Sequence, residues 1–208
     1  MKIKRLILGA LETNCYVLTD ENTGDCVIID PAYNAQQVVD YLSDNHLTPI
    51  AILLTHGHFD HCGGVSCITD KYDVPVYCHN LDVAMAHYAQ HNEYSIPARN
   101  CDVTNPFDNE DDICVGNYHI SVMHTPGHTP GSVCYFVYNY MFSGDTLFAG
   151  SIGRTDLAQG NPKQMIDSLC RIARIKADYI MYPGHDISST LSNEQANNMY
   201  LAGVIRFD

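Results

Sequence analysis

A continuous apolar segment, residues 49–54, leads directly into a cluster of polar side chains, and this junction constrains the fold more than any other feature. An uninterrupted apolar run of this length, ending at a threonine, predicts a strand that is covered on both faces, as in α/β proteins. The residues that follow, 55–61, read THGHFDH. The sequence therefore predicts a buried strand that carries histidine and aspartate side chains at its end.

The rest of the chain supplies strands first and then an alternation of strands and helices. Apolar residues at helical spacing predict helices at 35–46, 163–177 and 193–202. Residues 99–115 are polar and acidic and predict a loop with a short hairpin. Further strands are predicted at 2–8, 15–18, 26–29, 74–78, 118–124, 132–138, 139–142 and 179–182. This order predicts an α/β fold of two sheets with helices packed outside them, in a single domain over residues 1–208.

Three further polar motifs lie in the second half of the chain. They are HTPGHTPG at residues 124–131, SGDT at 143–146 and PGHD at 183–186. Each begins where a predicted strand ends. We therefore expect a sandwich of two sheets to bring these motifs and the THGHFDH segment to one edge.

Imidazole and carboxylate side chains are the ligands that suit zinc and iron. His56 and His58 point the same way in an extended loop, and His124 would complete a three-nitrogen site. Asp60 and His61 can turn to a second ion, which His185 would complete. Asp145 is placed to lend an oxygen to both ions. Two ions that lie a few ångströms apart can hold one hydroxide between them for attack on an acyl carbon at neutral pH.

Composition argues against several other classes of protein. The net charge is −13, from 11 Lys and Arg against 24 Asp and Glu, and the chain has no basic run that would bind nucleic acid. No segment is long and apolar enough to span a membrane, and residues 1–11 lack the cleavage site of a signal peptide, so we expect a cytoplasmic protein. The nine cysteines form no C-x-x-C pair, which argues against a disulfide framework and a thiolate zinc cluster.

The four motifs resemble the signature of the metallo-β-lactamase superfamily, which is His-x-His-x-Asp-His followed by a His, an Asp and a last His. The resemblance implies a four-layer αββα sandwich with the site at one edge. It assigns His56, His58 and His124 to one ion, Asp60, His61 and His185 to the other, and Asp145 to both. It implies two divalent cations per chain, zinc in the first place, with iron or a zinc, iron and manganese mixture as alternatives.

Within that superfamily the chain is similar to the small glyoxalase II-like hydrolases, which act on hydroxyacylglutathione. The similar segments are TNCY at residues 13–16, GDTLF at 144–148 and GRTDL at 153–157. The reaction implied is hydrolysis of a small thioester, S-lactoylglutathione or a related acyl thiol. The chain ends shortly after His185, so we expect the C-terminal helical extension of full-length glyoxalase II to be absent.

Substrate recognition departs from the glyoxalase II pattern. Where that family has a lysine and a tyrosine, this chain has Arg154 and Asp156. Arg154 is suited to hold a substrate carboxylate through paired hydrogen bonds, and a structural ion pair is the alternative. The oligomeric state is left open.

Other activities are also compatible with these residues. The GRTD segment resembles persulfide dioxygenases, which use one iron and would hold it here through His56, His124 and Asp145. A lactonase or β-lactamase activity, and a metal-binding protein without catalysis, are further alternatives.

Four single residues have two interpretations each. Asp60 is either a ligand only or also a catalytic group that accepts a proton. His128 lies four residues after His124 and is either a ligand itself or, as we expect, supports a ligand or the loop by a hydrogen bond. Cys62 is either redox-active at a helix start or a buried small residue. Tyr182 either lines the substrate cleft or packs at a strand end.

Overall fold

The computed structural model describes residues 1–92, 94–108 and 110–205. The chain divides into two compact units, each with its own sheet and hydrophobic core. The first consists of Met1–Asp108 and Cys114–Tyr118, and the second of Asn109–Ile113 and His119–Asp208. The single domain expected over residues 1–208 stays a prediction.

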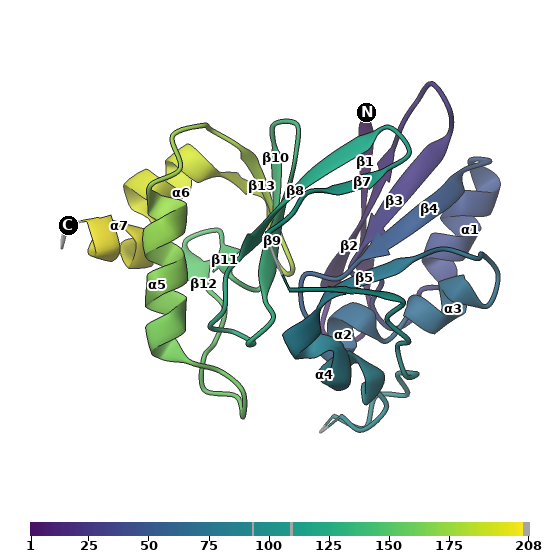
Figure 1. Ribbon diagram of the computed structural model, residues 1–208, viewed down its shortest axis with the longest axis horizontal. Coiled ribbons are helices and arrows are strands. Elements are labelled where there is room, and N and C mark those ends of the chain that lie inside the picture. The colour runs from purple at the N-terminus through teal and green to yellow at the C-terminus, as the bar shows by residue number, and fades with distance from the viewer. Residues whose placement is uncertain (93, 109, 206–208) are drawn as a thin grey trace. The chain divides into compact units, whose positions relative to one another are not determined.

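The first unit contains a mixed six-stranded sheet in the order β1-β2-β3-β4-β5-β6 (Figure 1). Its first three strands pair antiparallel, and β3, β4, β5 and β6 pair parallel. The strands are β1 (Lys2–Leu8), β2 (Thr13–Thr19), β3 (Asp25–Ile29), β4 (Thr48–Leu53), β5 (Val76–His79) and β6 (Asn105–Phe107). The helices are α1 (Gln36–Asp44), α2 (Phe59–Cys62), α3 (Val65–Thr69) and α4 (Val83–His87), with a 3-10 turn, η1, at Asn80–Asp82.

The core of the first unit lies between the sheet and α1. Val38 and Leu42 of α1 belong to the same buried cluster as Val17, Ile28 and Ile52 of the strands. The helix predicted at 35–46 and the buried strand predicted at 49–54 are thus confirmed as α1 and β4. Every residue of β2 and most residues of β3 are buried.

The second sheet has the order β14-β13-β10-β9-β8-β7, and a separate two-stranded sheet pairs β11 with β12. The boundary between the units crosses β7 and the first residue of β8. The strands are β7 (Ile113–Val115), β8 (Tyr118–His124), β9 (Val133–Val137), β10 (Tyr140–Gly144), β11 (Leu147–Phe148), β12 (Ser151–Ile152), β13 (Ile180–Pro183) and β14 (Ser189–Thr190). The helices are α5 (Pro162–Ala173), α6 (Leu191–Asn197) and α7 (Met199–Ile205).

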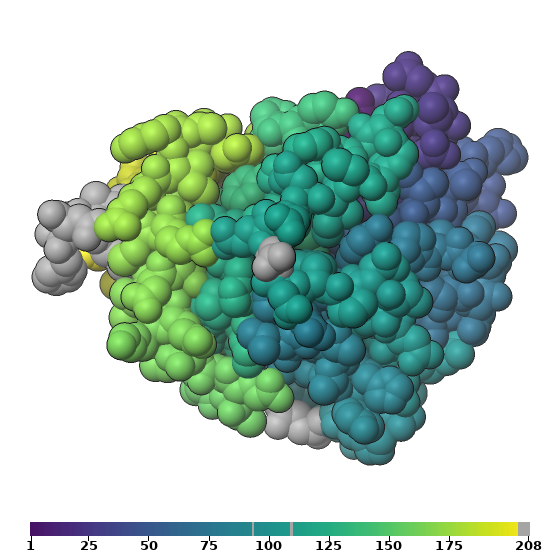
Figure 2. All heavy atoms as spheres, viewed as in Figure 1, coloured from purple at the N-terminus to yellow at the C-terminus, as the bar shows by residue number. Residues whose placement is uncertain are grey.

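The core of the second unit forms where α5 packs on the sheet. Met165, Leu169 and Ile172 of α5 share a buried cluster with Met141 and Met181 of the strands. The helix begins at a strong start signal, because Asn161 caps it by accepting from two backbone N–H groups and proline follows at the first helical position. Residues of α5 (green) lie on the face of the molecule that Figure 2 shows.

Two expectations from the sequence are wrong. The hairpin expected within residues 99–115 does not form, because β6 pairs with β5 and β7 joins the second sheet. The single helix expected at 193–202 is two helices, because the backbone of Asn198 is extended, with φ −73° and ψ 117°, and separates α6 from α7. Within the described residues, no helix is long and apolar enough to cross a membrane.

Candidate metal centre

The THGHFDH segment is anchored by Asp30, the residue directly after β3. Asp30 accepts hydrogen bonds from the backbone N–H of Thr55, at 2.8 Å, and from its hydroxyl group, at 2.6 Å. Its Oδ2 also lies 2.9 Å from Nδ1 of His61. Because β3 and β4 are parallel neighbours, their carboxyl ends meet, and one buried carboxylate can hold both ends of the segment.

The bond to Asp30 determines which nitrogen of His61 is available. A carboxylate only accepts, so Nδ1 of His61 carries the proton and Nε2 keeps its lone pair. That Nε2 lies 3.5 Å from Oδ2 of Asp60, which the hydroxyl of Thr13 also contacts at 3.5 Å. Metal-binding histidines are oriented in this way by a carboxylate on the other ring nitrogen.

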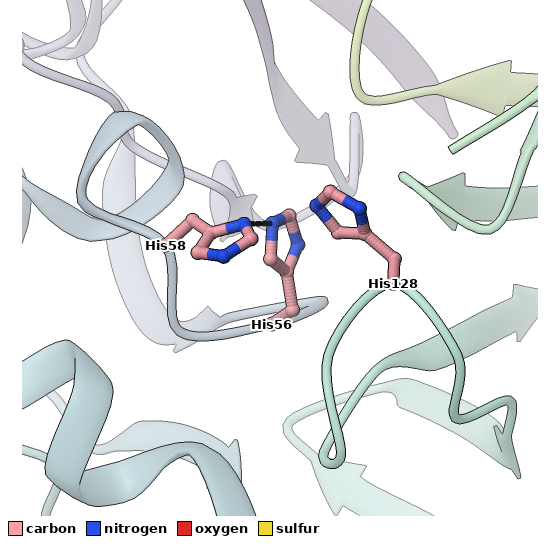
Figure 3. A group of neighbouring side chains, drawn as sticks. All are labelled: His56, His58 and His128. Atoms are coloured by element: carbon pink, nitrogen blue, oxygen red, sulfur yellow. Dashed lines mark hydrogen bonds between the residues drawn. The ribbon is translucent and has the colours of Figure 1, made fainter. Parts of the chain in front are cut away.

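His56 is oriented by the same network. The hydroxyl proton of Thr55 goes to Asp30, so its oxygen accepts from Nδ1 of His56, at 3.1 Å. Nε2 of His56 is then unprotonated and faces Nδ1 of His58 at 3.1 Å, the contact drawn as a dashed line in Figure 3. Two nitrogens bound to one tetrahedral zinc at its usual distances are separated by about 3.3 Å. The spacing of this donor pair therefore fits a metal ion.

Gly57 lets the segment pass close to η1. A Cβ atom at this position would lie 2.6 Å from the backbone oxygen of Asp82, which no real side chain tolerates. The backbone N–H of Gly57 donates to the carboxylate of Asp82 at 2.9 Å. Glycine at 57 is thus required for the path of the segment between its two histidines.

The second unit carries a separate group of donors around Asp145. Oδ2 of Asp145 lies 3.4 Å from Nε2 of His128 and 3.6 Å from Nε2 of His185. Nδ1 of His128 donates to the backbone oxygen of Arg154 at 2.8 Å, so Nε2 is the nitrogen with the lone pair. His128 projects from the loop between β8 and β9, as Figure 3 shows. One carboxylate oxygen is thus shared by two imidazoles.

His124 is placed differently from its expected role as a ligand. Its Nε2 lies 2.8 Å from the backbone oxygen of Pro130, so this nitrogen carries a proton and donates it. Its backbone is also held, because the N–H donates to Glu110 and the oxygen accepts from Arg171. Nε2 of His128, by contrast, faces Asp145. The role of His124 as a ligand, which the resemblance implies, stays a prediction.

The loop after β12 packs directly on Asp145. A Cβ atom at Gly153 would lie 1.7 Å from the backbone oxygen of Asp145, so only glycine fits. The guanidinium of Arg154 forms two hydrogen bonds, of 2.7 and 2.8 Å, with the carboxylate of Asp156. These bonds lower the pKa of Asp156 to about 2. Arg154 thus has the structural ion pair, and its role as a substrate anchor stays a prediction.

Two other residues follow the simpler of their interpretations. The thiol of Cys62 is fully buried, and its pKa is raised well above the usual value by a hydrogen bond with Cys101 and by burial. A protonated buried thiol is not a redox nucleophile, so the interpretation of Cys62 as a buried small residue is confirmed. Tyr182 stacks on Phe142 with ring centroids 5.5 Å apart, which fits a packed strand-end aromatic.

Two contributors were not predicted from the sequence. Asp30 orients His61, and the backbone oxygen of Arg154 orients His128. A signal existed for Asp30, because it directly follows a predicted strand, as the other motifs do. No sequence signal identifies a backbone carbonyl as the partner of a histidine ring.

Comparison with known proteins gives the class of this chain. The model of the metallo-β-lactamase superfamily matches residues 8–185. The chain belongs to this superfamily, and the predicted α/β metallo-β-lactamase fold is confirmed. It is therefore a member of a superfamily of metal-dependent hydrolases.

Particular relatives narrow this class. The chain is 35% identical to the probable metallo-hydrolase YqgX of Bacillus subtilis over 211 residues. The matched region covers 98% of this chain and 99% of that protein. It is 35% identical to a hydroxyacylglutathione hydrolase of Pectobacterium atrosepticum over 192 residues. This matched region covers 92% of this chain and 68% of that protein. The resemblance to glyoxalase II-like members is thereby confirmed.

Solved structures of similar proteins have the same fold. The BLEG-1 B3 metallo-β-lactamase superposes with a TM-score of 0.91 at 35% identity, covering 97% of this chain and 100% of that one. The protein TTHA1623 in a di-iron-bound form gives a TM-score of 0.85 at 32% identity, covering 95% and 99%.

Proposed function

We propose that this protein is a metal-dependent hydrolase of small thioesters, with S-lactoylglutathione or a related acyl thiol as substrate. The observation that carries the proposal is a set of ring nitrogens and carboxylates oriented as ligands, in a chain that is 35% identical to a hydroxyacylglutathione hydrolase. The proposal concerns the acyl thiol, which the fold alone does not specify.

Two divalent ions would be held by seven side chains. His56, His58 and His128 would bind the first ion, and Asp60, His61 and His185 the second, with Asp145 shared. This assignment replaces His124 with His128 because the lone pair of His128 Nε2 faces Asp145. Nitrogen and oxygen donors admit zinc, iron and manganese. TTHA1623, which is similar to this chain, is described in a di-iron-bound form.

The ions, when bound, supply a water that is deprotonated at neutral pH and polarise the thioester carbonyl. The residues of the chain hold the histidine rings in their orientation. Asp30 and Thr55 orient the rings of His61 and His56, so little reorganisation is needed as the reaction proceeds. Asp60, which Thr13 contacts, is the carboxylate that we expect to accept a proton as the thioester collapses.

A small apolar hollow beside Asp60 supports a short acyl chain. It has room for about one water-sized group. None of the described residues that line it is basic. Its apolar walls are contributed by Leu8, Leu11, Ala32, Phe59 and Ile96. A methyl-sized acyl end fits such a hollow.

Turnover of thioesters by the metal-loaded protein tests the proposal. We expect hydrolysis of S-lactoylglutathione, loss of activity with a chelator, and slower turnover as the acyl chain lengthens. Asp60→Asn should reduce kcat by at least about 100-fold, the size of a general acid–base contribution. Asp44→Asn, at an exposed position on α1, is the matched control and should leave kcat unchanged. A metal-loaded sample that hydrolyses none of the thioesters would contradict the proposal.

β-Lactam hydrolysis is the second candidate. It is supported by the similarity to BLEG-1, whose structure is described as that of a B3 metallo-β-lactamase. The same metal-loaded sample should be assayed with nitrocefin. A kcat/KM for nitrocefin that exceeds the value for every thioester would replace the thioester proposal.

A further inference from the structure

A buried carboxylate, Glu194 of α6, lies in the second unit outside the set of potential ligands. Its side chain is 1% exposed. Oε2 accepts from the backbone N–H of Gly150 at 2.7 Å and from the amide of Asn198 at 3.0 Å. Oε1 accepts from the hydroxyl of Ser189 and the amide of Asn193. A buried charge is tolerated only when it is hydrogen-bonded in this way.

These hydrogen bonds keep Glu194 ionised. Burial alone would raise the pKa of Glu194, but the bonds from Ser189, Gly150, Asn198 and Asn193 outweigh it and hold the pKa below its usual value. Hydrogen bonds to a charged acceptor are stronger than those to a neutral one. Glu194 is thus a firm anchor for the backbone of Gly150.

Asn198 extends the anchor to both strands of the β11–β12 hairpin. Its side-chain nitrogen lies 3.3 Å from the backbone oxygen of Phe148 and 3.0 Å from that of Ser151. It is also 1% exposed. The extended backbone of Asn198, which ends α6, brings its amide to the hairpin. Glu194 and Asn198 together therefore hold the turn and both strands of this hairpin.

The hairpin joins three parts of the donor group of the second unit. Asp145 precedes β11 by two residues, and Phe148 packs edge-on against the ring of His185, with centroids 6.2 Å apart. After β12, Gly153 contacts the backbone of Asp145, and the oxygen of Arg154 holds Nδ1 of His128. A shift of the hairpin would thus move the side chains of Asp145, His128 and His185.

We propose that Glu194 and Asn198 are positioning residues for the metal centre, because they fix the hairpin that orients Asp145, His128 and His185. They touch neither the substrate nor the ligand atoms in this role, and they act through the backbone of residues 148–154. The inference rests on the metal centre of the proposed function, but it makes no use of the thioester.

The test uses Glu194→Gln, which keeps the shape but replaces one accepting oxygen with an amide nitrogen. We expect the variant to fold, with a cobalt-binding affinity about 10- to 100-fold weaker than that of the wild type, as for other residues that support ligands. We also expect a shifted absorption spectrum of the bound cobalt and a lower kcat with unchanged KM. Glu21→Gln, at an exposed position, is the matched control and should match the wild type.

A purely structural role predicts a different result. If Glu194→Gln lowers the melting temperature but binds cobalt with the affinity and spectrum of the wild type, the proposal is overturned. If that variant does not fold, Asn198→Ala is measured by the same two criteria. Cobalt binding is independent of turnover, so a wild type that binds cobalt and hydrolyses no thioester would refute the proposed function and leave this inference standing.

Discussion

A histidine can bind a metal only through a nitrogen that carries no proton, and the partner of its other nitrogen decides which one that is. His61 and His128 both donate from Nδ1, to Asp30 and to the oxygen of Arg154, and keep Nε2 for a metal. His124 instead donates from Nε2 to Pro130. His124 therefore has its lone pair on Nδ1, whereas His128 has it on Nε2, although both occur in one repeated motif.

Replacing each of these two histidines in turn tests that difference. We expect His128→Ala to weaken binding of the metal by at least about 100-fold, because a tetrahedral ion would lose one of its ligands. His124→Ala should retain metal binding within a few-fold, because it loses the contact to Pro130 and no proposed ligand. Metal content and affinity are measured on both variants after circular dichroism shows that they are folded. The opposite order of the two affinities would restore His124 as the ligand.

At this scale the sequence predicts much of the candidate site but not all of it. The spacing of His56, His58 and His61 was sufficient to mark them as potential ligands, because they share one short segment. The choice between His124 and His128 depends on carbonyl groups of Pro130 and Arg154. Arg154 is 26 residues from His128, and such a contact leaves no local pattern in the sequence.

At the scale of secondary-structure elements, parallel pairing explains how one side chain holds both ends of the THGHFDH segment. The carboxyl ends of β3 and β4 lie together, so Asp30 can hold Thr55 and His61. Long apolar runs and helical spacing predicted β4, α1 and α5. They could not predict the break at Asn198, because residues on both sides of it have helical spacing and the amide is held by contacts to the β11–β12 hairpin.

The loop after β12 allows a prediction about the addition of one methyl group at Gly153. Gly153→Ala should lower the free energy of unfolding by about 1–3 kcal/mol, the usual cost of overpacking, because the new Cβ meets the backbone oxygen of Asp145. It should also weaken metal binding, since Asp145 must move. Denaturation in urea and metal titration measure the two effects.

Gly203→Ala in α7 is the matched control, since a Cβ there meets nothing within 4 Å. It should be neutral or raise the free energy of unfolding by up to about 1 kcal/mol, because alanine is the better helix former. If Gly153→Ala behaves like this control in both measurements, the close packing of this loop on Asp145 is not needed for the site.

At the scale of the whole molecule, the chain consists of two units with separate sheets and cores. The fold class was predictable because strands and helices alternate and because the motifs follow strand ends. The division into two compact units was not, because no linker or change in composition marks it.

The most direct measurement of the central claim is a crystal structure of zinc-loaded protein with anomalous scattering at the zinc edge. The proposal predicts two zinc ions in each chain. One should be bound by His56, His58 and His128, the other by Asp60, His61 and His185, and Asp145 should contact both. A map without zinc at these residues, with a single zinc ion, or with His124 as a ligand in place of His128 would contradict it.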